Sequence, residues 1–232
     1  MIKVNSAIVL FIIALVLYLL SIIINNDNLE LFSKPIIIPS IYYYYYTKVK
    51  GKINFLFTLS ILFFFIAEIL KILNEEDFLI SSLVFFGLPY VIVTFFLAQD
   101  FLYYSKVKNY EINSISFYII LFLLFYLLYN ILSFINESSQ LEFSIYIIYG
   151  ILLLVMSIMG FLIHFNFDNK ASTYMVYMVA FFIVSDLFFI FTKSTKDVWV
   201  IKIVYVLSQQ LSYYMYINYF VSRSKLFPHL KS

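Results

Sequence analysis

The sequence contains no cysteine and only two histidines among its 232 residues. The absence of cysteine excludes disulfides, thiol nucleophiles and zinc–thiolate sites. The two histidines, His164 and His229, are too few for a histidine-rich metal centre. We therefore expect neither a metal ion nor another cofactor.

Charge and glycine are also scarce. Charged residues make up 12% of the chain, whereas a soluble domain carries roughly 25%. The net charge is only +2, and the sequence has no basic patch outside the short loops. We therefore expect no nucleic-acid partner. There are 28 Phe and 22 Tyr but only 4 Gly, which indicates a composition bias, and a motif made only of aromatic residues therefore carries little information.

Apolar runs dominate what remains, because hydrophobic residues make up 64% of the chain. The runs are residues 7–24, 36–46, 54–73, 79–99, 115–135, 143–165, 172–192 and 198–221. All but the second have about the 20 residues that a helix needs to cross a bilayer. The sequence therefore predicts an all-α, polytopic membrane bundle of eight transmembrane helices, forming one domain over residues 1–232.

The first two runs need separate interpretation. Residues 7–24 are long for a signal peptide and are followed by NNDN rather than by a small-residue cleavage site, so we expect a retained first span. In the short second run, Pro35 suits a first helical turn and Pro39 is expected to bend the helix. A re-entrant second segment, which leaves seven spans, is the alternative.

Positive charges favour eight spans with both termini in the cytoplasm. In that arrangement the inner side holds Lys3, Lys48, Lys50, Lys52, Lys106, Lys108, Lys170, Arg223, Lys225 and Lys231. The outer side holds Lys34, Lys71, Lys193, Lys196 and Lys202. Cytoplasmic loops of membrane proteins are richer in Lys and Arg. A helical bundle of this kind points to the inner (cytoplasmic) membrane of a bacterium.

Two acidic residues lie far from the ends of their runs. Asp186 lies in the stretch FFIVSDLFFI, and the positions one helical turn away are Phe and Ile, so its helix offers no cation. Glu68 has a similar setting in IAEIL. A charge at bilayer depth costs at least about 2.5–3.5 kcal/mol, which makes such residues candidates for function.

The predicted topology brings these acids to one depth. Asp186 and Glu68 each lie about 14 residues from the inner end of a span, or roughly 21 Å. Tyr205 and Gln209 enter the bilayer at a comparable depth from the outer side. Lys34 can extend its ammonium from the outer mouth, although it can equally be an ordinary interfacial lysine. We predict a pocket with an acidic floor and a basic rim.

Structural roles are alternatives for every member of this group. Glu68 and Lys71 are three residues apart and can form an ion pair within one helix. Asp186 can bond to a neighbouring helix, and Tyr205 and Gln209 can form interhelical hydrogen bonds. The coincidence in depth is the observation that favours a shared site.

Three motifs resemble those of the YhhN family of membrane proteins, the lysoplasmalogenases. Residues 34–39 (KPIIIP) resemble the K-P-aliphatic-P opening of the family's second helix. Residues 182–186 (FIVSD) resemble its F-x-x-S-D signature, and Tyr205 with Gln209 resembles the following Y-x-x-A-Q. The order and spacing of these motifs in an eight-span layout extend the resemblance over nearly the whole chain.

The sequence departs from the family at three places and is identified as a divergent member. Ala67-Glu68 stands where the family has Gly-Asp. Thr94 or Phe95 stands near the place of a family histidine, and Ser208 replaces the alanine before the glutamine.

The resemblance implies hydrolysis of the vinyl ether of a lysoplasmalogen, with a lysophospholipid or another lipid as the substrate. In this hypothesis Asp186 donates the proton and Glu68 is the ionised partner in a two-carboxylate acid/base mechanism. Lys34 holds the phosphate, and Tyr205 and Gln209 orient the ether or the water. A non-catalytic lipid-binding protein or proton-coupled carrier of the same fold is the alternative, and a scaffold is a third. Homo-oligomerisation stays open.

Overall fold

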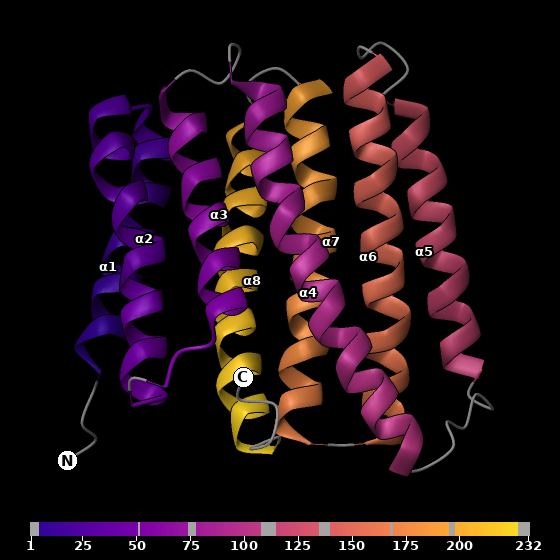
Figure 1. The fold of residues 1–232 in the computed structure, drawn as a ribbon. Coiled ribbons are helices and arrows are strands. Elements are labelled where there is room, and N and C mark those ends of the chain that lie inside the picture. Colours follow the sequence, from indigo (N-terminus) through magenta and orange to yellow (C-terminus); the bar gives the residue numbers. More distant parts are fainter. Residues whose placement is uncertain are drawn as a thin grey trace.

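The computed structural model describes residues 5–50, 52–73, 78–107, 115–134, 140–167, 169–194 and 198–226. Within these ranges the chain forms eight α-helices (Figure 1). They are α1 (Ser6–Ile24), α2 (Asp27–Lys48), α3 (Phe55–Leu73), α4 (Leu79–Val107), α5 (Ile115–Phe134), α6 (Gln140–Asn166), α7 (Lys170–Ser194) and α8 (Trp199–Leu226). Consecutive helices run up and down the bundle, with α1 joining α2 at the upper end in Figure 1.

Five helices of the described ranges, α1, α3, α4, α6 and α7, are long and apolar enough to cross a membrane. The outward face of α1 illustrates why a bilayer suits the fold. Leu10, Ile12, Ile13 and Val16 are all exposed on it. An apolar face of this kind is unfavourable in water but is solvated by lipid. These helices indicate an integral membrane protein.

The turn between α1 and α2 explains a boundary that hydrophobicity alone placed wrongly. Asn25 adopts a left-handed conformation with φ of 50°, which ends α1 and which asparagine tolerates. The side chain of Asn26 then accepts a hydrogen bond from the backbone N–H of Leu29 at 3.1 Å and caps α2. The second helix therefore begins at Asp27 and has 22 residues, so the expectation of a short second helix was wrong.

Both prolines consequently lie inside α2, and Pro35 is not in its first turn as the sequence suggested. Each proline leaves the carbonyl one turn earlier without its helical donor. Membrane helices tolerate this where neighbouring helices and serine hydroxyls compensate. Ser33 and Ser40 are buried near the prolines, but their hydroxyls donate to the carbonyls of Leu29 and Ile37, which are not the carbonyls that Pro35 and Pro39 leave without a donor.

Six of the helices form a closed ring. Going around it, α2 contacts α3, α3 contacts α4, α4 contacts α6, α6 contacts α7, α7 contacts α8, and α8 returns to α2. The other two helices lie outside, α1 against α2 and α8, and α5 against α6 and α7. The interior of this ring is where side chains from helices distant in sequence meet.

A buried ion pair ties α4 to α8 near the lower end of the ring. Nε of Arg223 donates to Oδ1 of Asp100 at 2.7 Å, and the hydroxyl of Tyr219 donates to Oδ2 at 2.6 Å. Arg223 also donates to the side-chain oxygen of Gln99 at 3.0 Å. Asp100 is 2% exposed and Arg223 is 3% exposed. Arg223 follows the last apolar run and was expected among the inner-side charges, and Asp100 was assigned no role, so the pair was not predicted.

Candidate functional site

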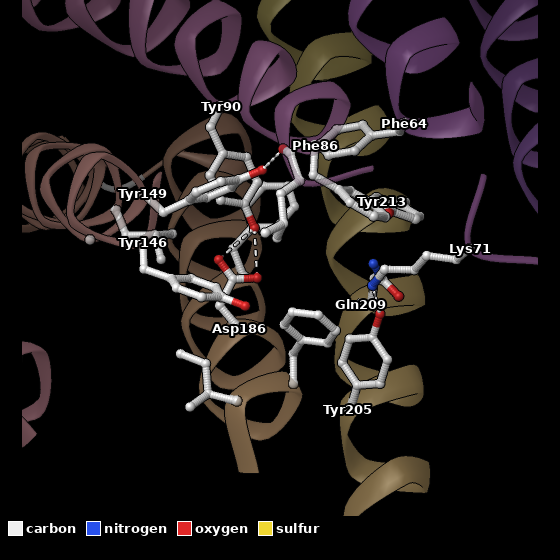
Figure 2. A pocket seen from close by; sticks show the side chains of 16 residues that line it. Phe64, Lys71, Phe86, Tyr90, Tyr146, Tyr149, Asp186, Tyr205, Gln209 and Tyr213 are labelled. Carbon is white, nitrogen blue, oxygen red and sulfur yellow. Dashed lines mark hydrogen bonds between the residues drawn. The ribbon is translucent and has the colours of Figure 1, made fainter. Parts of the chain in front are cut away.

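A small cavity lies inside the upper half of the ring, between α3, α4, α6, α7 and α8 (Figure 2). Its volume is about 60 Å³, which is room for a few water molecules at roughly 10–15 Å³ each. Most of the lining side chains are aromatic or aliphatic, and the polar ones include Lys71, Asp186 and Gln209. We call this space the cavity.

Asp186 of α7 faces the cavity and is held by Tyr90 of α4. The hydroxyl of Tyr90 lies 3.1 Å from Oδ1 and 3.0 Å from Oδ2 of Asp186 (Figure 2). Tyr90 is buried and also lines the cavity. The hydrogen-bond donor for this carboxyl is thus a phenol on another helix, since its own helix offers no cation.

A second tyrosine supports the first. Tyr149 of α6 packs against Tyr90 with the ring centroids 5.2 Å apart in an edge-to-face arrangement, and its hydroxyl donates to the carbonyl of Leu83. Gly87 makes this approach possible, because a Cβ at that position would lie 3.3 Å from the Tyr149 hydroxyl. These contacts between α4 and α6 fix the ring that carries the Asp186 donor.

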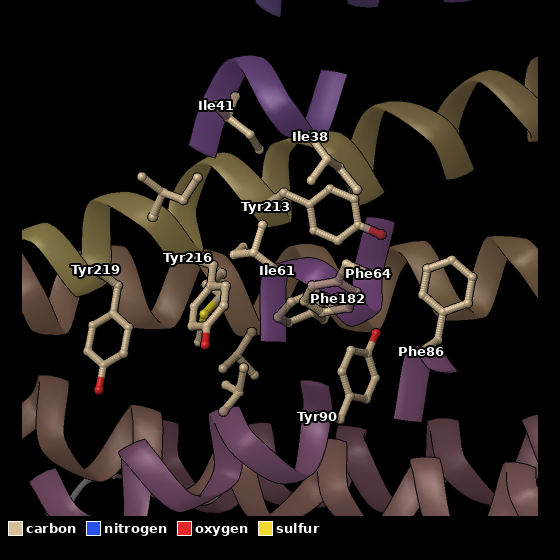
Figure 3. Close-up of a cluster of buried hydrophobic side chains, with 14 of the residues drawn as sticks. Ile38, Ile41, Ile61, Phe64, Phe86, Tyr90, Phe182, Tyr213, Tyr216 and Tyr219 are labelled. Atoms are coloured by element: carbon tan, nitrogen blue, oxygen red, sulfur yellow. The ribbon is translucent and has the colours of Figure 1, made fainter. Parts of the chain in front are cut away.

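A layer of buried aromatic side chains forms part of the cavity wall, and Figure 3 shows these rings packed together. Phe64 of α3 lies between Phe182 of α7, at 5.9 Å between ring centroids, and Tyr213 of α8, at 4.7 Å. Tyr90 contacts the other side of Phe182 at 4.8 Å. Such pairs contribute about 0.5–1.5 kcal/mol each beyond their buried area. The layer joins four helices of the ring and separates the cavity from the ion pair of Arg223.

Glu68 lies behind this layer rather than on the cavity wall. Its Oε1 accepts a hydrogen bond from the hydroxyl of Tyr213 at 3.1 Å, and its Oε2 faces Nζ of Lys34 at 3.5 Å. Among the described residues, those lining the cavity include Tyr213 but not Glu68. The two acids are therefore not neighbours on one surface, and Tyr213 is the residue that connects Glu68 to the cavity.

Lys34 is buried between two carboxylates. Its Nζ lies 3.5 Å from Glu68 and 3.7 Å from Glu30 on its own helix, and the second oxygen of Glu30 lies 3.7 Å from Nζ of Lys202. Lys34 is only 7% exposed. The structure pairs Glu68 with Lys34 of α2, whereas the sequence suggested Lys71 of its own helix as the partner. A lysine already paired with two carboxylates is less available to hold a phosphate than its position in the sequence suggested.

The Lys34–Glu68 pair should be energetically coupled. In a double-mutant cycle with Lys34→Met and Glu68→Gln, we expect a coupling free energy of about 0.5–3 kcal/mol, because each single change leaves a buried partner group uncompensated. The measurement is unfolding of the four proteins in mixed micelles. Additivity of the two single changes within about 0.3–0.5 kcal/mol would contradict the pairing.

A second, wider space opens above the cavity, at the upper end of the bundle. Its volume is about 730 Å³, and we call it the vestibule. Charged side chains of α2, α3 and α8 line it, namely Glu30, Lys34, Lys71 and Lys202. The vestibule also contains Trp199, which is exposed. Its walls are thus polar and carry three lysines against one glutamate.

Tyr205 and Gln209 of α8 both line the cavity, as the sequence predicted. The hydroxyl of Tyr205 accepts a hydrogen bond from Nζ of Lys71 at 2.7 Å. Gln209 is buried one turn further along α8 and shares the cavity wall with Asp186 (Figure 2). Three of the five candidate residues therefore meet in the cavity, while Lys34 lines the vestibule and Glu68 lies behind Tyr213.

Three residues at the site were missed by sequence reasoning. Tyr90, Tyr149 and Tyr213 were discounted with the other aromatic residues because of the composition bias. The pattern that could have singled out Tyr213 is its place one turn from Gln209 on the polar face of α8. Nothing comparable marks Tyr90 or Tyr149. No protein-family model, curated protein or solved structure matches this chain.

Proposed function

We propose that this protein is a membrane-embedded hydrolase that cleaves the vinyl ether bond of lysoplasmalogens, releasing a fatty aldehyde and a glycerophospho-headgroup. One observation carries the proposal. A carboxyl group, Asp186, faces a small cavity in the apolar interior and is hydrogen-bonded to the neutral hydroxyl of Tyr90. Apolar surroundings favour the protonated form of a carboxyl group. That form is the one that can act as a general acid and protonate a carbon atom.

The chemistry requires one proton donor and one water. Asp186 gives its proton to the carbon of the double bond that does not carry the ether oxygen. The electron pair of the double bond forms the new C–H bond. The resulting oxocarbenium ion lies beside the new Asp186 carboxylate, which stabilises it. Water attacks the cation and returns a proton to Asp186. The hemiacetal then breaks down to the aldehyde and the glycerol hydroxyl, so that the sum of the steps consumes one water.

Other polar residues have supporting roles in this proposal. Gln209 shares the cavity wall with Asp186 and can orient the attacking water through its amide. Glu68, paired with Lys34, is the ionised carboxylate of the site. It acts through Tyr213, whose hydroxyl donates to Glu68 at 3.1 Å, and it adds negative charge on the far side of Tyr213 from the cavity. Glu68 is thus a positioning residue rather than the base.

The two spaces fit an amphiphile with a single chain. The vestibule carries lysines and can take a phosphate-containing headgroup, whereas the cavity is lined by apolar side chains such as Leu153 and Ile190 and can take the start of the chain. Asp186 faces the cavity just below the vestibule, where the ether of such a lipid lies. The resemblance of residues 34–39 and 182–186 to the YhhN motifs supports the same substrate class.

The proposal places all eight helices across the inner membrane of a bacterium, with the vestibule facing outwards. Lys48 of α2, Lys106 of α4, Lys170 of α7 and Lys225 of α8 lie at the lower end, which the positive-inside rule assigns to the cytoplasm. Lys3, Lys108, Lys196 and Lys231, which entered the same prediction, lie outside the described residues.

A proton-coupled carrier is the competing interpretation, and the lower half of the ring distinguishes the two. A carrier must open this half to release its cargo. In this structure Phe57 stacks on Phe220 at 4.3 Å between ring centroids, and Asp100 and Arg223 pair just below. A ring filled and tied in this way suits a site with access from one end, which favours the hydrolase.

The proposed function is tested with two lipids that share a headgroup. We expect the purified protein to release fatty aldehyde from a 1-alkenyl lysophospholipid and to leave the 1-acyl lysophospholipid intact, because Asp186 protonates a carbon–carbon double bond that the ester lacks. Mass spectrometry measures both products. Release of fatty acid from the acyl lipid, or no turnover of either, would count against the proposal.

A further inference from the structure

One side of the vestibule is an apolar lip. It consists of Ile23 of α1 together with Val198 and Trp199 at the start of α8, and all three side chains are exposed. Ile23 follows Val16 and Leu20 along one face of α1, and both of these are exposed as well. Helix α1 lies outside the ring, so this face meets lipid. The vestibule therefore borders directly on the apolar surface that faces the membrane.

Trp199 places the lip at the edge of the bilayer. Tryptophan side chains gather at membrane–water interfaces, where their rings lie at the level of the lipid headgroups. Trp199 is exposed, and it is the single tryptophan of the chain. Lipid headgroups thus lie at the height of the lip, beside the polar walls of the vestibule.

Lys202 lines the vestibule next to the lip and is held only weakly. It follows Trp199 by three residues, which puts both on one side of α8. Its Nζ lies 3.7 Å from Oε2 of Glu30, and its side chain is 48% exposed. An ion pair this exposed contributes little to stability, and Glu30 keeps Lys34 as a partner at 3.7 Å. Lys202 can therefore leave Glu30 for a phosphate, whose oxygens accept charge-assisted hydrogen bonds.

The size of the cavity decides where the chain of a bound lipid lies. The cavity has room for a few water molecules, so it holds at most the first carbons of such a chain. The vestibule is lined by charged side chains, which a lipid chain would strip of water. A lipid whose phosphate reaches Lys202 in this structure therefore keeps its chain in the membrane, and the lip is the apolar surface along which the chain leaves the vestibule.

We propose that the vestibule takes up a single-chain phospholipid sideways from the outer leaflet, with the phosphate on Lys202 and the chain along the lip. From this position the ether moves on to Asp186. The choice of leaflet and the vinyl ether rest on the proposed function, whereas the binding of a phosphate-bearing lipid does not. The lip selects lipids over free phosphate compounds, and Lys202 selects phospholipids over neutral lipids.

The fluorescence of the single tryptophan tests this site without any hydrolysis. Bromine atoms quench tryptophan fluorescence on contact, so a lysophospholipid with a chain brominated near the glycerol reports binding at the lip through Trp199. An alkyl ether is used because it lacks the double bond that the proposed reaction needs. The protein is kept in micelles of a neutral maltoside detergent at constant concentration.

We expect saturable quenching by this lipid, and about tenfold weaker binding of the alkyl glycerol with the same brominated chain, because a hydrogen bond to a charged group is lost. Unbrominated alkyl lysophospholipid should reverse the quenching, and sn-glycerol 3-phosphate should not. Reversal by glycerol 3-phosphate at the same concentration would show that a free phosphate compound is the ligand and would overturn the lipid assignment.

Two pairs of variants test the two parts of the site. Lys202→Met should lose the preference for the phosphate-bearing lipid, while Lys48→Met, at the other end of the bundle, should keep it. Ile23→Asn should weaken binding about fivefold, because the chain loses an apolar contact. Ile24→Asn is its matched control, since Ile24 is 58% exposed and Ile23 is 54% exposed, but only Ile23 is among the described residues that line the vestibule.

An unchanged preference in Lys202→Met would overturn the phosphate assignment, and equal effects of Ile23→Asn and Ile24→Asn would overturn the lip. If these results are found but no aldehyde is released, the proposed function is refuted and the lipid site stands. If aldehyde is released but the quenching is not saturable, the lipid site is refuted and the proposed function stands.

Discussion

Asp186→Asn is expected to abolish aldehyde release from a lysoplasmalogen while leaving the bundle folded. The amide cannot give up a proton to carbon, and positioned acid catalysis contributes about 10²–10⁴-fold to a rate. Folding should survive because asparagine has the same shape as aspartic acid and still accepts the hydrogen bond that Tyr90 donates. The measurement is the initial rate of aldehyde formation, with thermal unfolding of both proteins in detergent alongside.

Two further variants make this result specific. Asp27→Asn removes a carboxyl in the exposed first turn of α2 and should leave the rate unchanged. Tyr90→Phe keeps the Asp186 carboxyl but removes its donor, so we expect a smaller loss than in Asp186→Asn. An Asp186→Asn protein with the rate of the original chain would show that this carboxyl is not the proton donor.

Breaking the buried pair at the lower end should have the largest effect on stability. Arg223→Met leaves the Asp100 carboxylate with a hydroxyl partner but no cation, in a place where it is 2% exposed. Removing one partner of a buried ion pair typically costs about 3–5 kcal/mol, chiefly through the charge left behind. Reversible unfolding in mixed micelles measures the change.

The double variant Asp100→Leu with Arg223→Met is the matched control for this effect. It removes both charges, and apolar replacement of a whole buried pair is often neutral or stabilising by about 1–4 kcal/mol. We expect it to recover most of the stability lost in Arg223→Met. Equal destabilisation in the single and double variants would mean that packing, not the uncompensated carboxylate, causes the loss.

Helix positions were largely predictable because a segment in lipid must satisfy its own backbone groups. The apolar runs 54–73 and 115–135 correspond to α3 and α5 to within one residue at each end. An apolar run ends at the first charged residues, however, whereas a helix can continue past them. Helix α4 therefore continues to Val107 and α8 to Leu226. The same difference hid the first half of α2, which starts at the Asn26 cap.

The sequence predicted how deep the site residues lie in the bilayer, but not which of them face the interior of the ring. The rise of 1.5 Å per residue placed Glu68 and Asp186 at similar depth, but which side of a helix faces the ring interior depends on its neighbours. Lys71 and Glu68 are three residues apart, which turns them about 60° from each other around α3. In the structure Lys71 lines the cavity and Glu68 contacts α2 and α8.

Partners that are distant in sequence were the least predictable part. Tyr90 and Asp186 are 96 residues apart, and Asp100 and Arg223 are 123 apart. Nothing near either member marks the other. In a chain with 22 tyrosines, the one that bonds to Asp186 is identified only by the way α4 packs across the ring.

The fate of a solvent proton tests the central claim most directly. When the hydrolysis runs in D₂O and the aldehyde is reduced at once to the alcohol, we expect one deuterium at the second carbon, because the exchangeable proton of Asp186 is delivered there. Mass spectrometry locates the label. Aldehyde that carries no deuterium at that carbon, or labelled aldehyde formed equally fast by Asp186→Asn, would contradict protonation of the vinyl ether by this carboxyl.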